Sequence, residues 1–148
     1  MKYLFFSPLF FVIACTNVQT KHSSIAKSQF EKALAGWWDE GRESEGLCGP
    51  DRSLHRHVFS SDYKQVTWKF DKPFQRKRQG DTVSSYGYDI LDASSVVLTL
   101  SMQDEDRILE NGEPVLWELV IVGPNIYKWR ATHWGEIGFA PIIGVRCK

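Results

Sequence analysis

The sequence predicts an all-β domain, a single antiparallel meander barrel of about eight strands preceded by a short helix. Apolar and polar residues alternate with a period of two in most of the chain after residue 38, as in strands that bury one face. Turn-forming residues separate these stretches, and a chain of 148 residues suits one domain. The same alternation is also compatible with an open sheet or a β-sandwich.

A helix is expected first, over residues 24–35, because Ile25, Phe30, Ala33 and Leu34 fall on one helical face. The pattern ends at Gly36 and changes to a period of two. The folded domain is therefore expected to cover residues 25–148.

The predicted strands contain apolar residues at every second position. These residues are Val66, Trp68 and Phe70; Tyr86, Tyr88 and Ile90; Val96, Leu98, Leu100 and Met102; Val115, Trp117, Leu119 and Ile121; and Tyr127, Trp129 and Ala131. Asn111-Gly112 predicts a two-residue type I′ hairpin with arms over 107–110 and 113–117. The polar and basic segment 72–81 predicts a long connection between two strands.

The first residues have the pattern of a secretory signal. Lys2 supplies a positive charge, an apolar run follows, and the small Ala14 lies at its end. The run is too short to cross a bilayer as a stable helix. We therefore expect this leader to be removed.

The residue after Ala14 is a cysteine, and Val12-Ile13-Ala14-Cys15 resembles the lipobox of bacterial lipoproteins. The resemblance implies a signal peptide over 1–14, acyl chains such as palmitate on Cys15, and a lipidated tether over 15–24. In that family an Asp after the cysteine favours the inner membrane, and Thr16 stands there instead. The expected location is the cell envelope, at the outer membrane facing the periplasm. The alternative is a secreted protein cleaved at another position.

Two further cysteines, Cys48 and Cys147, lie near the two ends of the predicted domain. An even pair in an oxidising compartment most simply forms a disulfide, which here would join those ends. Two independent thiols are the alternative.

The segment that follows the predicted helix resembles the Gly-x-Trp opening of lipocalins, with Gly36 and Trp38 as the matching pair. The resemblance implies a calycin-type barrel. It also implies that Arg146, near the end of the chain, packs over Trp38 and closes one end of the barrel.

Aromatic residues make up 14% of the chain and include six tryptophans. Large flat side chains of this kind can line a pocket for a small apolar molecule, and they can equally fill a core. The residues expected to face inward and to line such a pocket are Trp68, Tyr86, Tyr88, Trp117 and Trp129.

Catalytic, metal and cofactor signatures are weak in this sequence. His55 and His57 share one side of a strand, but no third ligand with a recognisable spacing accompanies them, and a structural or solvent-facing pair is favoured. The serine pairs lack a nucleophile elbow, and no phosphate-binding loop is present. We therefore expect no catalytic residue, no metal and no cofactor, and a protein that is not an enzyme.

The charge pattern argues against nucleic acid as a partner, because 18 basic residues balance 18 acidic ones and do not form a basic surface. Two functions remain. The first is a membrane-anchored envelope lipoprotein, held through acylated Cys15, that binds a small apolar or amphipathic ligand inside the barrel. The second is an envelope interaction or inhibitor module, similar to lysozyme-inhibitor lipoproteins, with a filled core and a protein partner.

Overall fold

The computed structural model describes residues 26–76, 80–135 and 138–148, and it confirms the predicted fold class. Within these residues, a helix over 26–33 precedes eight antiparallel strands that close into one barrel, in which β8 pairs with β1. The elements are β1 (Trp37–Gly41), η1 (Glu43–Glu45), β2 (His55–Phe59), β3 (Gln65–Gln75), β4 (Thr82–Ala93), β5 (Val97–Met102), β6 (Leu116–Gly123), β7 (Ile126–Ala131), η2 (Thr132–Trp134) and β8 (Ile143–Cys147). The predicted signal peptide, Cys15 and the tether lie outside the described residues.

Each strand pairs with its neighbour in the sequence, so the order around the barrel is that of a meander. The predicted inward residues alternate with exposed or half-buried ones. Leu98, Leu100, Leu119 and Tyr127, for example, are fully buried. This alternation places one continuous apolar core inside the barrel rather than between two sheets.

The helix covers one end of the barrel, here called the closed end. Phe30 and Leu34 pack with Trp38 into the core, and the Trp38 indole Nε1–H donates to the Leu34 carbonyl at 2.9 Å. The Arg146 guanidinium lies over the Trp38 ring, 4.8 Å from its centroid, and donates to the carbonyls of Ala33 and Ala35. These contacts fix the helix on the barrel by both apolar packing and hydrogen bonds to its last carbonyls.

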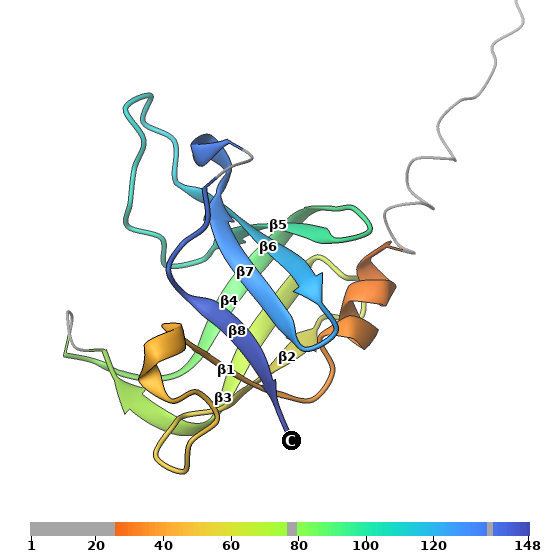
Figure 1. The fold of residues 1–148 in the computed structure, drawn as a ribbon. Helices are drawn as coiled ribbons and strands as arrows, with labels where there is room; N and C mark the ends of the chain where they lie inside the picture. The colour runs from red at the N-terminus through yellow and green to blue at the C-terminus, as the bar shows by residue number, and fades with distance from the viewer. Residues whose placement is uncertain (1–25, 77–79, 136–137) are drawn as a thin grey trace, which may run out of the picture.

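The other end of the barrel, here called the open end, has no α-helix over it among the described residues, and only the short η1 and η2 lie beside its cavities. Figure 1 shows the helix on one side of the barrel and, on the other, the long hairpin of β3 and β4 and the loop between β5 and β6. A ligand that enters the barrel would therefore enter past these loops.

Two local predictions were wrong. Asn111-Gly112 does not form a type I′ turn, because only Gly112 has a positive φ, and the predicted arms make a single bridge between Ile108 and Pro114. Pro114 has no N–H to donate to a ladder, so regular pairing begins only at β6. The segment 72–81 is also less of a loop than predicted, since β3 continues to Gln75.

Candidate functional site

Glu40 is the centre of a polar cluster inside the barrel. It lies two residues after Trp38 on β1, so its side chain points to the same inner face as Trp38. Its Oε1 accepts hydrogen bonds from Tyr127 Oη at 2.5 Å, Trp129 Nε1 at 2.8 Å and Trp68 Nε1 at 3.2 Å. Three donors from two strands, β3 and β7, thus converge on one carboxylate oxygen.

A glycine makes room for this cluster. Gly144 on β8 lies between Glu40 of β1 and Tyr127 of β7 in the strand register. A Cβ at Gly144 would lie 2.0 Å from the Tyr127 ring. Because no side chain occupies this position, the phenol can cross β8 and reach the carboxylate.

The hydrogen bonds continue from Tyr127 to a buried histidine. His55 Nε2 lies 3.1 Å from Tyr127 Oη. Since that hydroxyl already donates to Glu40, it accepts from His55, so Nε2 of His55 carries a hydrogen. The Nδ1 atom of His55 is buried, and within the described residues it has no hydrogen-bond partner.

The second histidine of β2 is also held by one hydrogen bond. The His57 Nδ1 atom lies 3.2 Å from the Leu34 carbonyl, to which it must donate. Burial lowers the pKa of His55, against the attraction of Glu40, and burial lowers the pKa of His57 still further. The two histidines lie among the aromatic rings on the inner face of β2, His55 buried and His57 half-buried, whereas the sequence left open whether the pair is structural or faces solvent.

These two histidines predict that the domain loses stability in mild acid. Their pKa values are lower in the folded state, so below about pH 6.5 the unfolded chain binds protons that the folded chain does not. We expect the free energy of unfolding, from urea titrations, to fall by about 1–2 kcal/mol between about pH 7.5 and 5.5. Aspartates and glutamates with lowered pKa values change the free energy of unfolding only in more acidic solution, where they bind protons.

The matched variants for this pH test are His57→Gln and His133→Gln. His57→Gln is expected to flatten the pH dependence, whereas His133→Gln, on the exposed η2, is expected to keep the slope of the parent chain. Equal stability of the parent chain at both pH values would contradict the prediction.

Two cavities open at the end of the barrel that the helix leaves free, and Glu40 lines both. The larger one, of about 620 Å³, lies beside the hairpin of β3 and β4 and is lined by charged residues and by Phe70 and Phe74. The smaller one, of about 360 Å³, is mainly aromatic. Its wall consists of Tyr88, Met102, Arg107, Trp117, Trp129, Trp134, Ala140, Pro141 and Ile142. A molecule that enters from either side therefore meets the carboxylate of Glu40.

The loop between β5 and β6 is held against this aromatic wall. Glu105 accepts from Arg107 Nε and Nη2 and from the Trp117 indole Nε1–H at 2.7 Å, and the Arg107 guanidinium lies 4.5 Å over the Trp117 ring. Burial alone raises the pKa of Glu105, but the hydrogen bonds from Arg107 and Trp117 outweigh it, and its pKa is lowered. The charge of Arg107 is thus matched by Glu105.

The five predicted pocket-lining residues form part of one aromatic cluster. Tyr88, Trp117 and Trp129 line the smaller cavity, whereas Trp68 is fully buried beneath it and Tyr86 packs on Phe70 and Phe74. Ring centroids of Trp68 and Tyr88 lie 4.5 Å apart, and those of Tyr88 and Trp129 lie 5.9 Å apart. A role in ligand binding stays a prediction for these residues.

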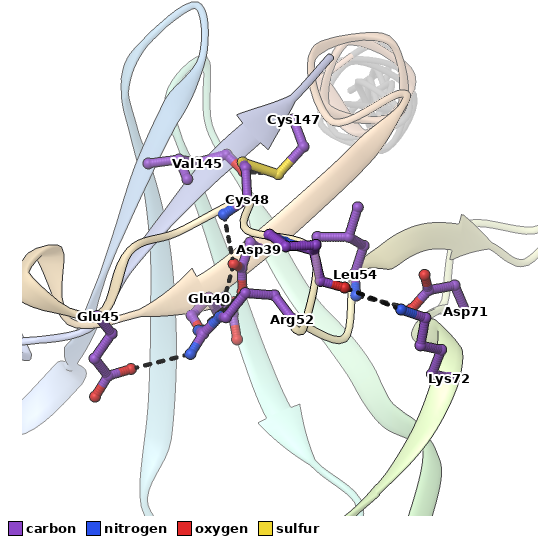
Figure 2. A network of polar contacts seen from close by, with 11 residues as sticks. Asp39, Glu40, Glu45, Cys48, Arg52, Leu54, Asp71, Lys72, Val145 and Cys147 are labelled. Carbon is purple, nitrogen blue, oxygen red and sulfur yellow. Dashed lines mark hydrogen bonds and ion pairs between the residues drawn. A yellow bond between two sulfur atoms is a disulfide. The ribbon is translucent and has the colours of Figure 1, made fainter.

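The disulfide between Cys48 and Cys147 confirms the pairing predicted from the cysteine count. It links the segment 42–54, which follows β1, to strand β8. Figure 2 shows this segment folded over Asp39. Asp39 is 1% exposed, and its carboxylate accepts from Cys48 N at 2.8 Å and from Arg52 Nε and Nη2 at 2.8 and 2.9 Å. Arg52 Nη2 also donates to the Glu40 carbonyl at 2.7 Å, so this network holds the backbone that carries Glu40.

Two further properties concern the described part of the chain. Within residues 26–76, 80–135 and 138–148, no three His, Cys, Asp or Glu side chains gather as metal ligands would. Nor does any helix there have the length and apolar character needed to cross a membrane.

Comparison of the chain with models of protein families, with curated proteins and with solved structures finds no match. The function must therefore be argued from the site itself.

Proposed function

We propose that this protein is a membrane-anchored, lipocalin-like binding protein that takes a small amphipathic molecule into the open end of its barrel. The observation that carries the proposal is the position of Glu40, whose carboxylate lines both a larger cavity with a mostly charged wall and a smaller one with an aromatic and apolar wall. Ligand sites commonly combine an apolar wall with a few convergent polar groups of this kind.

The division of the barrel into two halves supports this function. The closed end is packed with Phe30, Leu34 and Trp38, and it leaves the cavities at the opposite end. An eight-stranded barrel has an interior that side chains can fill or that one small ligand can share. Here the apolar part of a ligand would contact Trp117 and Trp129, and its polar part would contact Glu40.

The proposed location rests on the sequence. The lipobox-like Val12-Ile13-Ala14-Cys15 supports lipidation, and the disulfide between Cys48 and Cys147 suits an oxidising compartment such as the periplasm. Two or more acyl chains on Cys15 would hold the domain on a membrane stably, since each buried CH₂ contributes about 0.8 kcal/mol.

The ligand is tested by native mass spectrometry of the chain from Thr16 to Lys148, which contains every strand of the closed barrel. The chain is produced in the periplasm, and its native mass is compared with its denatured mass. An added mass that is lost on denaturation supports the proposal. A bare mass, also after incubation with an envelope lipid extract, argues against it.

The anchor makes a separate prediction. Cells that express the full chain are expected to incorporate labelled palmitate into it and to retain it in the membrane fraction. Cys15→Ser is expected to abolish the label, and Cys48→Ser, which changes a cysteine of the barrel, is the matched control. Label in the Cys15→Ser chain, or none in the parent chain, would reject lipidation at Cys15.

Exposed apolar side chains favour the interaction module as a second candidate. Trp134 and Ile142 line the smaller cavity and are 44% and 41% exposed, and Phe139 is 40% exposed. The test is a pull-down from an envelope extract with a chain that carries no small molecule. Capture of one envelope protein by the parent chain, and loss of that capture in Trp134→Ala, would support this second function.

A further inference from the structure

We infer that the ligand of the open end is an organic cation, an alkyl- or arylammonium whose charged group contacts Glu40 between tryptophan rings. This inference rests on the proposed function and adds the chemical class of the ligand to it. Three features support it: Glu40 forms no ion pair among the described residues, aromatic rings lie beside it, and the Arg107 guanidinium lies over one of those rings.

The carboxylate of Glu40 has neutral partners only. Its three donors are two indoles and a phenol, all on Oε1, and no described residue donates a hydrogen bond to Oε2. A carboxylate can accept about four hydrogen bonds over its two oxygens, so capacity remains on Oε2. A negative charge in a half-buried site, with no positive partner, favours a cation there.

The nearby arginines do not supply that partner. Arg107 forms its ion pair with Glu105, and Arg52 forms its ion pairs with Asp39 and Glu45. Within the described residues, no Lys, Arg or His forms an ion pair with Glu40. The negative charge of Glu40 is also one of the influences, after burial, that raise the pKa of Tyr88 and Tyr127.

The wall around this charge suits a cation. Trp117 makes edge-to-face contacts with Trp129 and Trp134, at interplanar angles of 85° and 84°, so neighbouring rings present faces in different directions. An ammonium group placed among such rings is attracted by their π-faces as well as by the carboxylate. The Arg107 guanidinium, 4.5 Å over the Trp117 ring, shows that a cation can lie on this wall.

The same features disfavour other ligands. An anion that enters the smaller cavity would meet the charge of Glu40, whereas the one cation of that wall, Arg107, is already paired with Glu105. A neutral molecule of equal shape would bury the same apolar surface but would leave the carboxylate without a counter-charge. The site should therefore discriminate by charge more than by shape.

The test compares two probes of nearly equal shape, phenyltrimethylammonium and tert-butylbenzene, with benzoate as the anion. Binding to the chain from Thr16 to Lys148 is followed through the indole N–H signals in ¹H–¹⁵N spectra, which also report on the Trp68 and Trp129 bonds to Glu40. We expect the dissociation constant of the ammonium to be about 10- to 100-fold lower than that of its neutral counterpart.

The variant is Glu40→Gln, which removes the charge but keeps an oxygen that can accept from the three donors. We expect it to lose most of the preference for the cation while still binding tert-butylbenzene. The matched control is Glu118→Gln on the outer face of β6, where the carboxylate pairs with Arg130, and it should keep the preference.

The preference for the ammonium over its neutral counterpart is measured first in the parent chain. The test therefore remains valid even if Glu40→Gln does not fold. Equal binding of the two isosteric probes, or tighter binding of benzoate, overturns the cationic ligand and leaves a binding barrel in place. Binding of no probe also overturns it, and the native mass measurement then judges the proposed function separately.

Discussion

Glu40→Leu is expected to lower the free energy of unfolding by about 3–5 kcal/mol, although it replaces a charged residue by an apolar one of similar size. The substitution leaves the indole N–H groups of Trp68 and Trp129 and the hydroxyl of Tyr127 without their acceptor. Each buried donor that loses its partner costs about 1–3 kcal/mol. The relief from burying a lone carboxylate offsets part of this sum.

Glu40→Gln separates these two effects. The amide oxygen can still accept from the donors, so Glu40→Gln should cost less than half as much as Glu40→Leu. Both are measured by urea denaturation at neutral pH, with circular dichroism to show that the barrel is formed. A Glu40→Leu chain as stable as the parent would show that the carboxylate does not satisfy these donors.

Alternation was enough to predict the fold because each strand buries one face. Leu98 and Leu100, or Tyr127 and Trp129, lie on the face that their spacing assigns to the core. The meander order and closure followed from short connections and from the need to cover strand edges. Alternation by itself does not distinguish a closed barrel from an open sheet, and the pairing of β8 with β1 decides between them.

The centre of the site was missed because β1 does not look like a regular strand. Its Asp39-Glu40 pair interrupts the apolar pattern, and neither residue is among the predicted site residues. Trp38 was expected to close the barrel, however, and a period of two from Trp38 places Glu40 on the same inner face. The spacing of two residues from Trp38 is therefore the sequence signal that indicates the inward position of Glu40.

Other parts of the site depend on contacts that no local pattern contains. Asp39 is on the outer face of β1 and is nevertheless buried, because the segment up to Arg52 folds over it. The space at Gly144 matters only because Tyr127 lies opposite it in the register between β7 and β8. Each contact joins two different elements, so the spacing of residues within one strand does not reveal it.

The disulfide supplies the second large effect. Replacing Cys48 and Cys147 together by serine is expected to lower the free energy of unfolding by about 3–5 kcal/mol, because the bridge closes a loop with a sequence separation of 99 residues. The chain-entropy model places the upper value near 4–5 kcal/mol. For a domain of this size the thermal midpoint should fall by about 10–20 °C.

Unfolding of the double variant should begin at β1 and β8, because the bridge links the segment over Asp39 to the last strand. Cys48 also has a positive φ of 64°, which a non-glycine residue adopts at some cost, and the bridge helps to hold it there. Thermal unfolding of the parent chain with and without dithiothreitol provides the control: the reductant should lower the midpoint of the parent and leave that of the double variant unchanged. If the double variant has the same thermal midpoint as the oxidised parent, the bridge does not stabilise the fold. In that case the contacts of Asp39 with Arg52 and with the backbone N–H of residue 48 are sufficient to hold this segment in place.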